Sequence, residues 1–317
     1  ITPNQIRADI FGKEPDKNSM MDSYYLPINL IPIATEKSVN KSFKPITKAE
    51  DETEKRRAKL WRSIIIKAEP LERPFARAMS KLFKEQKAEV LGNWEKANKK
   101  KSAFKLDSNI TKESVTQAEL FDEQVWIEKF NKEALPFITE AIKTGGNHAL
   151  TDLGVDEVFN IRNPATEQMI HDRLQMFGIK VNGTTTEKIA EQITIGMNNG
   201  ESISEIAARL SNIFDQAEVY RANVIARTET MNAFNYGNME GMIQSGLVDE
   251  HEWITSRDAN VRTEETAPGN SHLALDGVTV KLGEDFPVGF NYGGWTAAWP
   301  SDYNERCSTS PVRKQAA

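Results

Sequence analysis

The stretch QAEVYRANVIARTETMNAFNYGNMEGMIQSGLVDEHEWIT, residues 216–255, decides the fold because its residue pattern changes partway along. Its first part predicts a long helix from about Gln216 to Ser245, which Gly246 ends, as glycine commonly does just after a helix. Residues 251–255 and 278–282 are instead strand-like. Beyond them Gly, Pro and Trp become frequent. We therefore expect an α+β protein, mostly helical in its N-terminal and central parts, with a small loop-rich β region at the C-terminus.

Two further helices are expected upstream of this stretch. Apolar residues recur near helical spacing over residues 72–105 and again over 115–143, where Gly145-Gly146 is expected to end the helix. Pro136 should kink the second helix. Two long amphipathic helices of this kind usually pair as an antiparallel hairpin.

Shorter helices should fill the interval before residue 216. One is expected over residues 163–178, closed by Gly178. Two capping boxes follow, in which a hydroxyl and a carboxylate each satisfy a free backbone N–H. They are Thr184-x-x-Glu187 and Ser202-x-x-Glu205, and each predicts a helix start.

The chain divides into four expected parts. Residues 1–35 form a separate proline-rich unit. Residues 36–71 are interpreted as a linker, with a loosely formed helix start over 36–60 as the alternative, because few apolar residues occur between Ile46 and Leu60. Residues 72–160 form the helical hairpin, and residues 161–317 form the C-terminal domain.

Composition excludes several classes of protein. With a net charge of -6 and a pI near 5.5, the chain is not a general nucleic-acid binder. The basic runs at residues 55–57 and 99–101 are interpreted as solvated helix faces. The single cysteine, Cys307, permits no disulfide within the chain and no paired-thiolate metal knuckle. Neither a membrane-spanning apolar run nor a signal peptide is visible.

A series of separate motifs follows a defined order in the C-terminal half: ARTE at 226–229, WITSRDANVR at 253–262, His272, LDG at 275–277, Phe286, and Arg306-Cys307. This order resembles the phage Mu F-like minor head protein family, also called the head-morphogenesis family, over about residues 165–307. The sequence departs from the family pattern twice. Residues 263–271 separate Arg262 from His272, and the usual C-R-C ending is reduced to one cysteine.

The resemblance implies a structural minor capsid component of a tailed phage or prophage, bound at the portal vertex and acting in head assembly and DNA packaging or ejection. It places the protein in the virion head, and in the host cytoplasm during assembly. The implied partners are the portal protein and other head proteins, with packaged double-stranded DNA as a further candidate. It implies no cofactor, no metal, no membrane association and no enzymatic activity.

The N-terminal segment carries a second resemblance. Thr2-Pro3-Asn4-x-Ile6-Arg7 and Tyr25-Leu26-Pro27-x-Asn29-Leu30 are similar to the C-terminal end of long-tailed-phage portal proteins. Portal and Mu F-like proteins are encoded by adjoining genes and are sometimes fused. A chain that begins with Ile1 rather than Met is the expectation for a fragment of such a fusion.

The motif residues allow a structural interpretation and a chemical one. Arg227 and Glu229 are expected to pair with the loop of residues 258–262 and lock the helix to the β region. Trp253 is expected to fill the small core. Asp258, Arg262, His272 and Asp276 are the best candidates for chemistry, since two carboxylates and a histidine can bind a metal or move protons.

We favour a satisfied hydrogen-bond network for these polar residues. Two alternatives remain open. One is a metal-dependent or Cys/His-dependent hydrolase that uses this cluster, in which His272 could activate the Cys307 thiol. The other is a DNA-binding virion protein.

Overall fold

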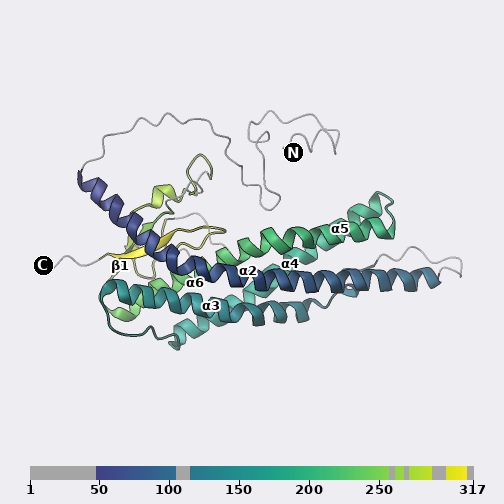
Figure 1. The fold of residues 1–317 in the computed structure, drawn as a ribbon, viewed down its shortest axis with the longest axis horizontal. Helices are drawn as coiled ribbons and strands as arrows, with labels where there is room; N and C mark the ends of the chain where they lie inside the picture. The colour runs from purple at the N-terminus through teal and green to yellow at the C-terminus, as the bar shows by residue number, and fades with distance from the viewer. Residues whose placement is uncertain (1–47, 105–114, 257–260, 268–270, 288–297, 313–317) are drawn as a thin grey trace. The chain divides into compact units, whose positions relative to one another are not determined.

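A computed structural model describes residues 48–104, 115–256, 261–267, 271–287 and 298–312. The chain separates into two compact units, residues 1–56 and 57–317, and nearly all described residues belong to the second. Figure 1 shows the second unit as long helices lying side by side, with a small sheet at one end of them. The three strands form one antiparallel sheet, which confirms the expected α+β class.

The first described helix, α2, spans Lys48–Phe104 and is much longer than the sequence predicted. Its start lies inside the expected linker of residues 36–71, so that segment is helical from Lys48 on. Lys, Glu, Arg and Ala dominate residues 48–60, and all of them favour helix. Farther along, Ile64 and Ala68 are buried against Phe234 of a later helix. Low apolar content therefore marked an exposed helix rather than a linker.

Helices α3 (Glu123–Leu153) and α2 form the expected antiparallel hairpin. Phe75 stacks on Phe137 with ring centroids 4.8 Å apart, and Phe83 lies 5.4 Å from Phe130. The contacting residue numbers rise along α2 and fall along α3, so the two helices run in opposite directions. These rings belong to one large buried core that extends through the remaining helices.

The expected helix ends at Gly145-Gly146 and at Gly178 are wrong. Helix α3 continues to Leu153 and is capped by Gly154 at a φ of 75°, and α4 runs without a break over Pro164–Asn198. These glycines mark close helix contacts instead. A Cβ atom on Gly145 would lie 2.0 Å from the carbonyl oxygen of Phe234, and one on Gly178 would lie 2.5 Å from Asn131 Oδ1. Glycine inside a helix costs about 1 kcal/mol relative to alanine, and close packing offsets that cost.

One predicted capping box exists and the other does not. Ser202 caps α5 (Ile203–Gln216), and Glu205 Oε2 accepts a hydrogen bond from the Ser202 backbone N–H at 2.7 Å. Thr184 instead lies in the middle of α4, where its hydroxyl donates to the carbonyl of Lys180. A hydroxyl can bond to its own helix in this way, so the spacing alone does not identify a helix start.

Helix α6 (Ala222–Ser245) follows α5 through a π-helical turn, η3, at Ala217–Arg221. It ends at Gly246 with a φ of 64°, as predicted. The sheet has the order β2-β1-β3, with β1 at Glu250–Ile254, β2 at Thr279–Lys281 and β3 at Ser308–Val312. The sequence did not predict β3, which contains Pro311. As an edge strand, β3 tolerates proline.

Buried His251 makes the fold acid-sensitive. Its ring lies 5.0 Å from that of Phe286, and neither nitrogen has a hydrogen-bond partner among the described residues. Burial lowers its pKa from 6.5 to about 4. The unfolded chain therefore binds a proton more readily, so stability is full above pH 6.5 and falls as the pH drops towards 4.

We expect the free energy of unfolding to be about 2 kcal/mol lower at pH 5 than at pH 7 through His251 alone. His251→Leu should reduce this pH difference by that amount in urea titrations at the two pH values. His171→Gln, which alters an exposed histidine, is the control and should leave the difference unchanged. An unaltered difference in His251→Leu would contradict this role.

Within the described residues, no helix combines the length and the apolar character needed to cross a bilayer.

Candidate functional site

Asn235 of α6 holds the C-terminal segment through both ends of its side-chain amide. Its Nδ2 donates to the carbonyl oxygens of Pro300 and Cys307, each at 2.9 Å. Its Oδ1 accepts a 2.6 Å hydrogen bond from the Ser308 hydroxyl. The residue is fully buried. Asn235 thus supplies hydrogen-bond donors to backbone carbonyl groups of the segment that leads into β3.

Other polar residues on the same helix act in the same way. Asn238 donates to the carbonyl of Thr309 at 2.8 Å, and the hydroxyl of Thr228 accepts from the backbone N–H of Asn304 at 3.0 Å. Arg227 donates to the Asn304 side chain at 3.0 Å. Steps of seven and three residues along an α-helix stay near one face. A polar face of α6 therefore binds the segment that leads into β3.

Asn235→Ala is expected to lower the free energy of unfolding by about 2–3 kcal/mol, because it leaves two buried carbonyl oxygens without a donor. Chemical denaturation followed by circular dichroism measures the effect. Asn223→Ala is the matched control on the same helix, since Asn223 is exposed and its side chain bonds to the carbonyl of Val219 one turn earlier. Equal stabilities for the two variants would contradict the assigned role of Asn235.

Arg227 and Glu229, the expected partners of the loop at residues 258–262, have other partners. Glu229 forms a buried ion pair with Arg173 of α4, with a 2.6 Å hydrogen bond from Arg173 Nε. Arg227 reaches Glu72 of α2 at 3.5 Å. The ARTE motif therefore ties α6 to two other helices and, through Asn304, to the C-terminal segment.

Asp276 of the Leu-Asp-Gly turn also has a bracing contact. Its Oδ1 accepts two hydrogen bonds of 2.9 Å, from the backbone N–H and the hydroxyl of Thr255. Its Oδ2 lies 3.6 Å from Arg57, which also pairs with Glu252 of β1 at 3.1 Å. Gly277 has a φ of 80°, and a Cβ atom there would lie 2.2 Å from Arg57. Asp276 thus joins the turn to β1 and α2.

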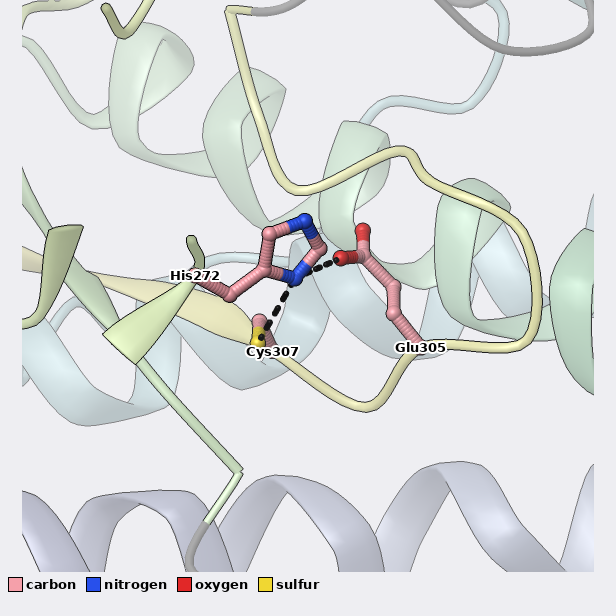
Figure 2. Close-up of side chains that lie close together, drawn as sticks. All are labelled: His272, Glu305 and Cys307. Carbon is pink, nitrogen blue, oxygen red and sulfur yellow. Dashed lines mark hydrogen bonds and ion pairs between the residues drawn. The ribbon is translucent and has the colours of Figure 1, made fainter. Parts of the chain in front are cut away.

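His272 is the centre of the remaining polar cluster, shown in Figure 2 with two of its neighbours. Its Nδ1 lies 3.0 Å from Glu305 Oε2 and 3.7 Å from Cys307 Sγ. Its Nε2 faces Asp302 Oδ2 at 3.5 Å. The edge of the ring packs against Trp253, with centroids 5.4 Å apart. All of these residues are buried, His272 and Cys307 to 1% exposure.

Arg262 completes this arrangement from the opposite side. It pairs with Asp302 at 2.8 Å and donates to the carbonyl of Tyr303 at 2.7 Å. Arg262 and His272 are therefore brought together through Asp302, whereas Asp276 bonds to Thr255. Asp258, the fourth residue of the predicted cluster, lies outside the described residues.

Sequence reasoning missed two acidic members of the cluster, Asp302 and Glu305. Both lie within six residues of Cys307, in the stretch SDYNERC at 301–307. Acidic residues close to a lone cysteine were the only available signal. Trp253 does fill the small core as expected, together with Leu275, Phe286 and Cys307.

The surroundings of Cys307 disfavour nucleophilic chemistry. Burial and the nearby Glu305 carboxylate raise the pKa of its thiol well above 9. A thiol, unlike a thiolate, is a poor nucleophile, and a side chain with 1% exposure is closed to a macromolecular substrate. The cluster instead presents a nitrogen, an oxygen and a sulfur donor close together.

Comparison with known proteins gives one match. Residues 187–310 match the family described as Phage Mu protein F like protein. The matched range begins within α4 and ends within β3, and it includes α5, α6, β1 and β2. No curated protein and no solved structure matches the chain significantly.

Proposed function

Because residues 187–310 form a Phage Mu protein F-like domain, we propose that the chain is a structural minor head protein of a tailed phage or prophage. It associates with the portal, and it acts in head assembly and in DNA packaging or ejection. The family match carries this proposal, since membership indicates a head-morphogenesis protein whose partners are other phage head proteins.

The contacts of the motif residues support a structural role. Asn235, Asp276 and the Arg173–Glu229 pair all join one element of the fold to another. Buried polar groups that are fully hydrogen-bonded specify one arrangement of a core. A head protein needs such rigidity because it must hold its shape within an assembly.

The portal association is tested in phage particles. A lysogen or phage that lacks this chain should give fewer filled heads, and the plasmid-borne chain should restore them. Cross-linking of purified heads followed by mass spectrometry should connect exposed lysines such as Lys81 and Lys99 to the portal. Normal filled heads without the chain, or heads that contain none of it, would contradict the proposal.

The hydrolase alternative predicts a different response to substitution. If the motif residues act structurally, the yield of filled heads should follow melting temperature across Asn235→Ala, His272→Gln and the control Asn223→Ala. A His272→Gln protein with the native melting temperature and no function would favour chemistry at the cluster.

The DNA-binding alternative is decided by salt dependence. Real phosphate contacts release counterions, so affinity for duplex DNA must fall steeply as salt rises. At a net charge of -6, we expect no binding at physiological salt.

The portal fusion concerns residues 1–35, which lie outside the described residues. The coding sequence upstream of Ile1 tests it. Several hundred portal-like codons in the same reading frame would support the fusion, and a start codon directly before Ile1 would refute it.

A further inference from the structure

Three metal-ligand atoms converge where the turn at His272 meets the segment before β3. His272 Nδ1, Glu305 Oε2 and Cys307 Sγ all lie within 4.8 Å of one another. The nitrogen lies 3.0 Å from the oxygen and 3.7 Å from the sulfur. Around a tetrahedral Zn²⁺ ion, bonds of about 2.0–2.3 Å separate neighbouring donors by about 3.3–3.6 Å. The two distances from the nitrogen are close to those of such a ligand shell, and the oxygen and the sulfur lie within 4.8 Å of each other. Figure 2 shows the three side chains facing one another.

Glu305 supplies a second, independent observation. Its Oε1 accepts a hydrogen bond of 2.7 Å from the backbone N–H of Asp302, which fixes the carboxylate. Its Oε2 lies 3.0 Å from His272 Nδ1 and meets no hydrogen-bond donor among the other described residues. The residue is only 5% exposed. A buried carboxylate needs a positive partner, and a cation bound between this oxygen and the imidazole nitrogen would supply one.

The surroundings of His272 resemble the outer shell of a zinc site. Its Nε2 faces Asp302, which Arg262 holds in place at 2.8 Å. A histidine that binds zinc through one nitrogen usually directs the other N–H to a carboxylate, which fixes the tautomer and the ring orientation. The backbone N–H of Ser256 is directed at the sulfur of Cys307.

We propose that His272 Nδ1, Glu305 Oε2 and Cys307 Sγ bind one Zn²⁺ ion as a structural site that joins the turn at His272 to the segment before β3. The mixture of imidazole, carboxylate and thiolate donors is typical of zinc. Binding of the ion releases the proton of the Cys307 thiol, and the resulting thiolate and the Glu305 carboxylate balance the charge of the ion. The described residues supply three of the four donors of a tetrahedral site. This site does not depend on the proposed head function, and it revises the sequence-based expectation of no metal.

The first test uses the wild-type chain without an affinity tag. Elemental analysis after dialysis against Zn²⁺ should find about one equivalent per chain. Replacement by Co²⁺ should give a thiolate-to-cobalt charge-transfer band, which can only report Cys307 because the chain has no other cysteine. Removing the ion with a chelator should lower the melting temperature by at least about 5 °C.

Variants test the individual ligands. Glu305→Gln and Cys307→Ser should each weaken Zn²⁺ binding by at least about 10–100-fold, the loss typical even of outer-shell changes. Glu284→Gln, at an exposed glutamate, is the matched control and should bind normally.

The opposing result is a metal-free arrangement in which the His272 ring lies between Glu305 and Asp302 with no ion bound. Wild-type protein that is folded, retains no zinc and shows no charge-transfer band would establish that arrangement and overturn the proposal. This test uses only the wild-type protein, so it does not depend on whether any variant folds. It would also leave the head function unaffected.

Discussion

Gly237→Ala is expected to lower the free energy of unfolding by about 4 kcal/mol, at the upper end of what overpacking causes. A Cβ atom at this position would lie 2.0 Å from the carbonyl oxygen of Ile142 and 2.7 Å from its carbonyl carbon. Gly145 has the reciprocal contact with Phe234 of α6. Because backbone atoms cannot rotate away, α3 and α6 must separate, and every side chain packed between them loses contact.

Gly92→Ala is the matched control. Gly92 also lies within a long helix, and a Cβ atom there meets nothing within 4 Å. This substitution should stabilise the protein by about 0.5–1 kcal/mol, because alanine favours helix more than glycine does. Urea unfolding followed by circular dichroism measures both variants. A Gly237→Ala protein as stable as Gly92→Ala would show that α3 and α6 do not touch at Gly237.

Arg173→Met is expected to lower the free energy of unfolding by about 3–5 kcal/mol, because it leaves the buried Glu229 carboxylate without its positive partner. The two side chains are only 5% and 7% exposed, so water cannot replace the lost guanidinium. Glu229→Met should lower the free energy of unfolding by a similar amount, because it leaves the buried Arg173 guanidinium without its negative partner.

The double variant Arg173→Met/Glu229→Met distinguishes a buried pair from two independent contacts. Two apolar side chains of similar length can replace a buried ion pair with little loss. We therefore expect the double variant to be more stable than either single variant, with a coupling energy of at least about 2 kcal/mol. Additive losses would contradict the pairing of α4 with α6. Arg209→Met, which breaks a partly exposed pair with Glu201, serves as the control and should lower the free energy of unfolding far less than Arg173→Met.

Local sequence signals predicted those parts of the fold that local chemistry determines. Ser202-x-x-Glu205 marked a helix start and Gly246 a helix end, because a cap depends on residues within one turn. The same reasoning failed at Gly145 and Gly178. There the glycine serves a neighbouring helix, and a sequence pattern does not show which helices will be neighbours.

The sequence likewise predicted only part of the candidate site. The order of motifs identified His272, Arg262 and Cys307, which the structure brings together around Asp302 and Glu305. It did not identify Glu305, whose contact with His272 joins residues 33 positions apart. The sequence did not identify Arg173 as the ion-pair partner of Glu229, because Arg173 lies on α4, far from the motif in sequence. Most of the loop predicted to pair with Glu229 lies outside the described residues.

Native-state hydrogen exchange is the most direct test of whether α6 and the C-terminal segment form one folded unit. The backbone N–H of Asn304 bonds to the hydroxyl of Thr228 on α6, and that of Trp253 bonds to the carbonyl of Val278. The opening that exposes each of these two amides should have the same free energy, and the same dependence of that free energy on denaturant, as the opening that exposes the buried amides of α6. Exchange of the Asn304 and Trp253 amides through a low-energy opening while α6 stays protected would contradict the account.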